Sequence, residues 1–104
     1  MNDKLLSMLG MCRRAGKLVI GYEKSAESIK AHKAELVLVA SDTAARTEKE
    51  LRFVAKETVA VIRLTAPKED LSHAIGTPAG VVTVTDAGFA SKLQLLIQEG
   101  GTNI

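Results

Sequence analysis

Residues 35–40, ELVLVA, decide the fold, because they contain an unbroken run of leucine and valine that is too short for a helix. The run does not alternate with polar residues, which is typical of a strand covered by other parts of the protein on both faces. We therefore expect Glu35–Ala40 to be the central strand of a sheet that has helices on both sides.

The residues before this strand predict two helices and one more strand. A helix is expected from Tyr22 to about Lys33, a short strand at Leu18–Ile20, and a first helix over Asp3–Arg14 that Gly16 ends. The apolar positions at helical spacing are Tyr22, Ala26 and Ile29 in the later helix and Leu5, Leu9 and Cys12 in the first helix.

The residues after the central strand repeat the same alternation. Asp42 is expected to cap a helix that runs to about Glu57, and Val59–Leu64 is expected to form the third strand. Pro67 opens a short helix, because proline suits the first helical turn, and Gly76 closes it.

The last two elements are a strand at Val81–Thr85 and a helix that Asp86 caps. Phe89, Leu93, Leu96 and Ile97 form the apolar stripe of this final helix. The predicted element order is αβαβαβαβα, which indicates an α/β fold: a three-layer α/β/α sandwich around a four-stranded, largely parallel or mixed sheet, with residues 1–104 as a single domain.

The composition of the chain limits where in the cell we expect the protein and which kinds of site it can form. The chain of 104 residues has no apolar run long enough to cross a bilayer, and its first residues do not resemble a signal peptide, so we expect a cytoplasmic protein without membrane contact. Its one cysteine, Cys12, excludes an internal disulfide and a cysteine-based metal site. We expect a monomer with no cofactor, no bound metal and no catalytic residues.

Few side chains suit catalysis. His32 and His73 are expected on the surface without partner ligands, and Cys12 fits a helical core stripe better than a nucleophile. Asp42 and Asp86 each follow a strand and precede a helix, so each is interpreted as a helix cap. The alternative hypothesis is a phosphate-binding or small-ligand-binding α/β regulatory domain that uses these two aspartates; a third is a protein-interaction domain that docks through the final helix.

Basic residues are concentrated near the start of the chain. Arg13, Arg14, Lys17 and Lys24 fall within twelve positions, and we expect the end of the first helix and the start of the second to present them on a common surface. A helix N-terminus adds a partial positive charge and free N–H groups that suit phosphate oxygens. A solvated basic patch with no ligand remains an equal alternative on spacing alone.

Aromatic residues limit the kind of nucleic acid that such a surface could bind. The chain has one tyrosine, two phenylalanines and no tryptophan, too few for the stacking platforms of sheet-based single-strand binders. An RNA partner of this chain is therefore expected to be structured.

A longer motif carries a family resemblance. CRRAGKLVI followed by GYEKSAESIKAHKAELVLVASD, residues 12–42, resembles the kink-turn-binding ribosomal protein family, the L7Ae and L30e group, and in particular a bacterial branch of it. The likeness continues through the helix that begins at Pro67 and the strand VVTVTD at residues 81–86.

This resemblance implies an α/β/α sandwich whose second helix enters the groove of a bent RNA internal loop near sheared G·A pairs. It implies that the loop before the last strand touches an extruded base. The positions that match the family's RNA-binding residues are Gly21, Tyr22, Glu23, Lys24 and Ser25 in the second helix and Thr77, Pro78, Ala79 and Gly80 in the loop. Arg46 and Lys49, after the central strand, fall near the RNA face that the resemblance implies.

One part of the motif departs from the family pattern. The strongest kink-turn binders open the second helix with Gly, a small polar residue, Asn and Glu, whereas Glu23 and Lys24 take the last two places here. Lys24 can donate to base acceptors or phosphate, but an ionised Glu23 can only accept, and so suits base amino groups. Whether the second helix fits a kink-turn therefore depends on Glu23 and Lys24.

Overall fold

The computed structural model describes residues 3–100, and in them helices and strands alternate in the predicted order. The elements are α1 (Asp3–Arg14), β1 (Leu18–Ile20), α2 (Tyr22–Lys30), β2 (Leu36–Val39), α3 (Ala45–Ala55), β3 (Val61–Arg63), α4 (Lys68–Ile75), β4 (Val81–Val84) and α5 (Ala87–Gly100). No helix within residues 3–100 combines the length and the apolar character needed to span a membrane.

The four strands form one mixed sheet in the order β1-β4-β2-β3. β2 and β3 pair in parallel, whereas β4 lies antiparallel to both β1 and β2. β1, β2 and β3 therefore run in one direction and β4 runs in the other. This confirms the mixed sheet, with β2 in its interior.

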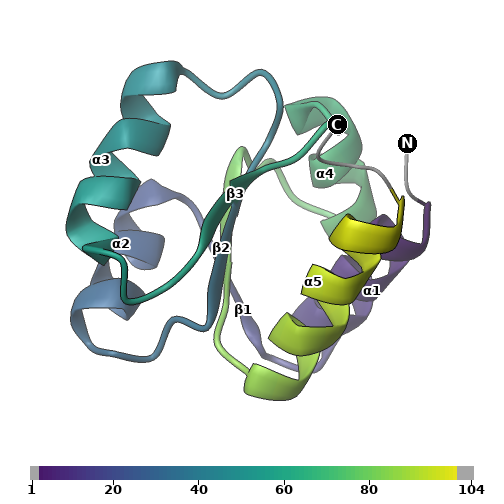
Figure 1. The fold of residues 1–104 in the computed structure, drawn as a ribbon. Coiled ribbons are helices and arrows are strands. Elements are labelled where there is room, and N and C mark those ends of the chain that lie inside the picture. Colours follow the sequence, from purple (N-terminus) through teal and green to yellow (C-terminus); the bar gives the residue numbers. More distant parts are fainter. Residues whose placement is uncertain (1–2, 101–104) are drawn as a thin grey trace.

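Helices cover both faces of the sheet, α1, α4 and α5 on one side and α2 and α3 on the other (Figure 1). Alternate residues of β2 supply the two cores: Leu36 and Leu38 pack with the first group of helices, and Val37 and Val39 pack with the second. All four side chains are fully buried, as expected of a strand covered on both faces. The sheet is thus the middle layer of an α/β/α sandwich.

Asp42 does not cap α3, which corrects one expectation. α3 begins only at Ala45, and its N-cap residue Ala44 forms no side-chain capping bond. The Asp42 carboxylate instead accepts a hydrogen bond from the backbone N–H of Lys68, at 2.8 Å, and so caps α4. The parallel pairing of β2 and β3 explains this, because it places the residues after both strands at the same end of the sheet.

Several element ends also differ from the expected ones. α2 stops at Lys30, three residues early, because the chain turns at His32 into a left-handed conformation with φ 61°. Asp86 does cap the last helix as expected, accepting from the backbone N–H of Phe89 at 2.9 Å. Gly76 ends α4 in the left-handed conformation, with φ 83°.

Candidate nucleic-acid interface

Three helices begin at one end of the sheet. Because β1, β2 and β3 are parallel in direction, the helices that follow them start at their common carboxyl end, where β4 also begins. We call this region the helix-start end; its segments are Gly21–Lys24, Ser41–Lys49, Pro67–Lys68 and Thr77–Gly80. Each helix N-terminus carries a partial positive charge, so the region is suited to anions before any side chain is counted.

Gly21 fixes how α2 enters this region. It is the N-cap residue, with φ 99° and ψ 161°, a backbone conformation essentially restricted to glycine. Its N–H donates to Val81 O at 2.8 Å, which joins the start of α2 to the start of β4. A glycine has no side chain to cap the helix, so the first-turn N–H groups of α2 keep no side-chain acceptor from this position.

Arg63, at the end of β3, holds the loop between β2 and α3. Its Nη1 donates to the carbonyl oxygens of Ala40, Ser41 and Thr43, and its Nε donates to Glu48 Oε1 at 2.7 Å. One guanidinium group thus satisfies several carbonyls of a segment about twenty residues away. This clamp occupies carbonyl groups of the segment that precedes α3 and so stabilises its loop conformation.

The loop Thr77–Gly80 lies back along α4. Ser72 Oγ accepts from the N–H of Ala79 at 2.8 Å and donates to its carbonyl at 3.3 Å. Thr43 Oγ1 donates to Gly80 O at 3.1 Å, and a Cβ on Gly80 would lie 3.8 Å from the Lys68 side chain. The loop is therefore fixed at both α4 and the β2–α3 loop, and only Pro78 within it is exposed.

Charge at the helix-start end is mixed. The exposed cations are Lys24, Arg46, Lys49 and Lys68, and the exposed acids near them are Glu23, Asp42, Glu50 and Glu69. Glu50 is paired with Arg46 at 3.3 Å, and Asp42 is engaged with the start of α4. The side-chain charges are balanced in number, so the partial positive charges of the helix starts are the contribution that favours an anion near the backbone.

The environment of Glu48 lowers the pKa of its carboxyl group. A side-chain hydrogen bond from Arg52, at 2.7 Å, is the main cause that lowers the pKa of Glu48 below the ordinary 4.5, and Arg63 adds to it. Burial of the carboxyl opposes the shift in part. The carboxylate form is therefore the one that the folded protein favours.

The lowered pKa predicts a pH-dependent contribution to stability. A carboxyl group whose pKa falls on folding stabilises the protein above its ordinary pKa, and the contribution disappears as pH falls through the folded value. In denaturant titrations, Glu48→Gln should lower the free energy of unfolding by about 1–2 kcal/mol at pH 7, and the difference should shrink below pH 4. Glu50→Gln is the control, because its partner Arg46 is almost fully exposed and such pairs contribute little. If Glu48→Gln lowered the free energy of unfolding equally at pH 7 and below pH 4, the lowered pKa of Glu48 would be contradicted.

The expected basic surface is divided in the structure. Lys17 O accepts from Thr85, at the far end of β4, whereas Gly21 bonds Val81, at its beginning. Four residues of extended chain separate Lys17 from Gly21 by about 13 Å. Lys17 and Lys24 therefore lie at opposite ends of the β1–β4 pair.

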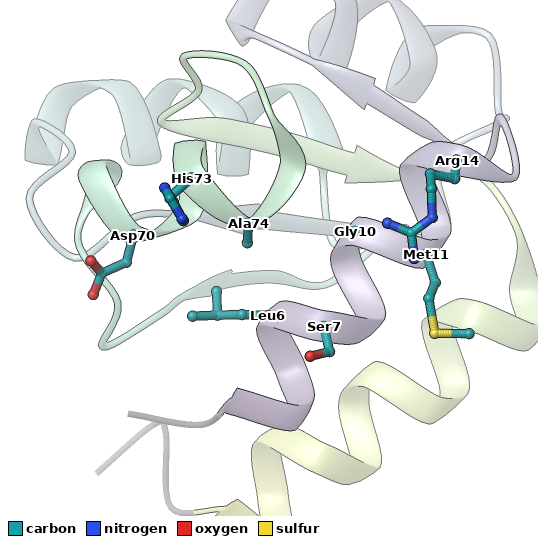
Figure 2. A pocket seen from close by; sticks show the side chains of 8 residues that line it. All are labelled: Leu6, Ser7, Gly10, Met11, Arg14, Asp70, His73 and Ala74. Atoms are coloured by element: carbon teal, nitrogen blue, oxygen red, sulfur yellow. The ribbon is translucent and has the colours of Figure 1, made fainter.

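Arg13 and Arg14 lie on the α1–α4 side of the protein. Arg13 Nη1 donates to Ile75 O at 2.6 Å, where a cation favours the C-terminus of α4. Arg14 folds back over Gly10 and lines a hollow of about 600 Å³ that His73 and Asp70 of α4 also line (Figure 2). The arginines are thus placed for roles outside the helix-start end.

Two matched positions have buried side chains. Ser25 is fully buried on the inner side of α2, and its hydroxyl has no hydrogen-bond partner within residues 3–100. Ala79 is 4% exposed. Gly21, Tyr22, Glu23 and Lys24 remain together at the exposed start of α2, and Lys49 lines a hollow beside Tyr22.

The residues of the alternative hypothesis are not brought together. Asp42 follows β2 and Asp86 follows β4, and because these strands are antiparallel the two carboxylates lie at opposite ends of the sheet. Within residues 3–100, no group of three or more Cys, His, Asp or Glu side chains is placed to hold a metal ion. Each aspartate instead accepts a backbone N–H at a helix start.

Cys12 is a core residue, as expected. The side chain is fully buried, and its thiol donates to Lys17 O at 3.3 Å. Burial, with a smaller effect from the charge of Asp86, raises the pKa of the Cys12 thiol to about 11. The thiol therefore stays protonated and unreactive near neutral pH.

Sequence reasoning missed Arg63, Thr43 and Lys68. Arg63 and Thr43 act through backbone carbonyls, which leave no mark in a residue pattern. Lys68 could have been found, because it opens a helix after a strand and parallel strands place such helices at the same end of the sheet.

Comparison with known proteins now decides the family. The model of the Ribosomal protein L7Ae/L30e/S12e/Gadd45 family matches residues 3–94. The chain belongs to this family. The resemblance in residues 12–42 is thereby confirmed over most of the chain.

Individual L7Ae-family relatives are similar over nearly their whole length. RNA-binding protein YlxQ of Enterococcus faecium is 30% identical over 96 residues, covering 92% of this chain and 93% of its own, and its Bacillus subtilis namesake is 33% identical over 91 residues, covering 86% and 91%. The large ribosomal subunit protein eL30 of Eremothecium gossypii is 31% identical, covering 90% and 92%. The YlxQ proteins confirm the expected bacterial branch.

Solved structures agree with the fold. A Bacillus halodurans protein described as having unknown function superposes with a TM-score of 0.86 at 33% identity, covering 91% of this chain and 97% of its own. The Giardia lamblia 15.5kD RNA binding protein has a TM-score of 0.69 at 20% identity, covering 92% of each chain. At that lower identity the likeness supports the fold alone.

Proposed function

We propose that this L7Ae-family chain is a non-catalytic protein that binds structured RNA at the helix-start end. The observation that carries the proposal is the start of α2, where Gly21 leaves the first-turn N–H groups without a side-chain cap beside the exposed Lys24. Backbone N–H groups at a helix start and a flexible lysine suit phosphate oxygens and base edges. Relatives at 30–33% identity that carry the name RNA-binding protein support the proposal.

The finer proposal is that the RNA is kink-turn-like. α2 would enter the widened groove, and the loop Thr77–Gly80 would touch an extruded base, with Pro78 as its exposed contact and Thr77 half-exposed. Ser72 and Thr43 hold this loop in place, so binding would select the bent RNA without reshaping the protein. We propose that the protein performs this role in the cytoplasm and as a monomer.

Lys24 provides the test of the finer proposal. Lys24→Ala should weaken binding to a kink-turn RNA by at least about fivefold, because it removes a donor from the groove-facing turn. Lys30→Ala is the matched control: it removes the same charge from an exposed site on the same helix, about 9 Å along the axis at its other end. Affinities are measured by fluorescence anisotropy at two salt concentrations, against the kink-turn RNA and a variant that lacks its G·A pairs.

The outcomes separate the coarse and fine proposals. Preference for the kink-turn RNA, lost in Lys24→Ala and kept in Lys30→Ala, is the expected result. Equal affinity for the two RNAs would overturn kink-turn recognition while keeping RNA binding. No affinity for either RNA at low salt would overturn both.

A further inference from the structure

Two of the three aromatic side chains in the sequence line one surface hollow. Phe53, on α3, is 76% exposed, and Tyr22, the first residue of α2, is 37% exposed. Together with Lys49, Glu50 and Val54 they line a largely apolar hollow of about 350 Å³ between α2 and α3. A phenylalanine this exposed gives up most of the stabilisation that burial would provide. Because Phe53 shares the hollow with Tyr22 and Val54, the three form an exposed apolar patch of the kind that marks binding sites.

Cations accompany Phe53 along α3. Arg46, Lys49 and Phe53 are spaced three and four residues apart, so they lie on one face of the helix. Glu50 is the carboxylate of the hollow, and it is paired with Arg46. Within the described residues of the hollow, the positive charge of Lys49 is therefore the one that is not paired in this way. The combination of an apolar aromatic floor and a cationic rim is complementary to a base and its phosphate.

The hollow is continuous with the helix-start end. Tyr22 directly follows Gly21 at the start of α2, and Lys49 lies near the start of α3. An RNA held at the helix-start end would therefore bring any unpaired nucleotides next to its duplex within reach of α3. A protein partner would find the same apolar rings, but the cations and this continuity favour RNA.

We propose that the hollow of Tyr22, Lys49 and Phe53 binds an unpaired nucleotide of a single-stranded segment that flanks the structured RNA. Phe53 stacks on the base, and Lys49 neutralises its phosphate. This rests on the proposed RNA binding and names a second contact that the bent duplex does not supply. It also modifies the expectation from composition: the few aromatics cannot build a sheet platform, but two of them form a site between helices.

The test compares a structured RNA with and without a tail of four unpaired nucleotides, placed at either strand end, with 2-aminopurine in the tail. For the unmodified protein, the tail should raise affinity about tenfold, as expected for one stacked base, and 2-aminopurine fluorescence should be quenched on binding. Phe53→Ala should abolish both effects and leave the affinity for the tailless RNA unchanged. Phe53→Tyr, which keeps the ring, should retain them.

Leu95→Ala is the matched control, because Leu95 is 55% exposed on α5 and lies outside the hollow. It should change neither the tail effect nor the quenching. A free 2-aminopurine-labelled tetranucleotide, titrated separately, tests the site without the duplex. If the unmodified protein quenches the fluorescence of this oligonucleotide and Phe53→Ala does not, the stacking site is supported even when the tailless RNA fails to bind. Failure of the tailless RNA to bind would overturn only the proposed function. No tail effect and no quenching at either strand end would overturn the stacking site alone.

Discussion

Replacing Arg63 by methionine is expected to lower the free energy of unfolding by about 2–3 kcal/mol and to weaken RNA binding by more than tenfold. The guanidinium group is two-thirds buried and donates to Glu48 and to the carbonyls of residues 40, 41 and 43. Without it, these acceptors depend on water, and the loop that positions Asp42 against α4 and Thr43 against Gly80 is released. Arg63→Lys should recover little, because an ammonium cannot reproduce the fork of donors.

Arg52→Met is the control for this experiment. Arg52 also bonds the Glu48 carboxylate, but its side chain is more exposed, and its side-chain hydrogen bonds within residues 3–100 go to Glu48 and not to the loop. It should cost less stability and leave RNA affinity unchanged. Denaturant unfolding gives the first quantity, anisotropy gives the second, and hydrogen exchange at the Lys68 amide reports whether the loop is released. Equal loss of affinity in both variants would contradict the clamp.

Gly21→Ala should have the second large effect. A Cβ at this position would meet no atom within 4 Å, so the cost is backbone strain from φ 99° and ψ 161°, about 1–3 kcal/mol. The strain is relieved only by rotating the peptide that begins α2, which moves its free N–H groups and Lys24. We expect RNA affinity to fall by more than tenfold while the protein stays folded.

Gly16→Ala separates strain from function. Gly16 also has a positive φ, 75°, and open space around its Cβ position, but it lies at the other end of β1. It should be destabilised by about 1 kcal/mol and should bind RNA with unchanged affinity. The comparison is made at a temperature where circular dichroism shows both variants to be folded. If Gly16→Ala binds as poorly as Gly21→Ala, general destabilisation and not the start of α2 is responsible.

Much of the fold could be predicted because its strands are dense apolar runs and its helices carry apolar stripes. Leu36–Val39 and Val81–Val84 are buried, and the stripe of Leu5, Leu9 and Cys12 forms part of the core. Local patterns of this kind fix which residues turn inward. They also indicated the alternating order, and hence the sandwich.

The loop boundaries could not be predicted in the same way. Asp42 was assigned to α3 because α3 follows it in sequence, but its actual partner is 26 residues away. The loop before α3 is held by Arg63, which is brought to it by the parallel pairing of β2 and β3. Such bonds follow from the strand directions, which the residue pattern left open between parallel and mixed.

The basic cluster shows the opposite error, in which closeness in sequence was taken for closeness in space. Arg13, Arg14, Lys17 and Lys24 are near neighbours along the chain, but β1 stands between the last two and carries them to different ends of the sheet. Lys24, Lys49 and Lys68 are far apart in sequence and lie at the same end. For the candidate site, the start of α2 came from a motif, and the rest came from topology.

The helix-start end is assembled from four segments spread between residues 21 and 80, and none of them is complete without the others. Gly21 is hydrogen-bonded to β4, Asp42 to the start of α4, and the Thr77–Gly80 loop to Thr43. Folding and recognition are therefore thermodynamically linked: a ligand that spans these segments binds the native chain and not the unfolded one, and at a hundredfold excess over its dissociation constant it adds about 2.7 kcal/mol to native stability. With RNA as the proposed ligand, the free protein and the RNA-bound protein would accordingly differ in lifetime. The amount of the protein in the cell would then follow the amount of its RNA.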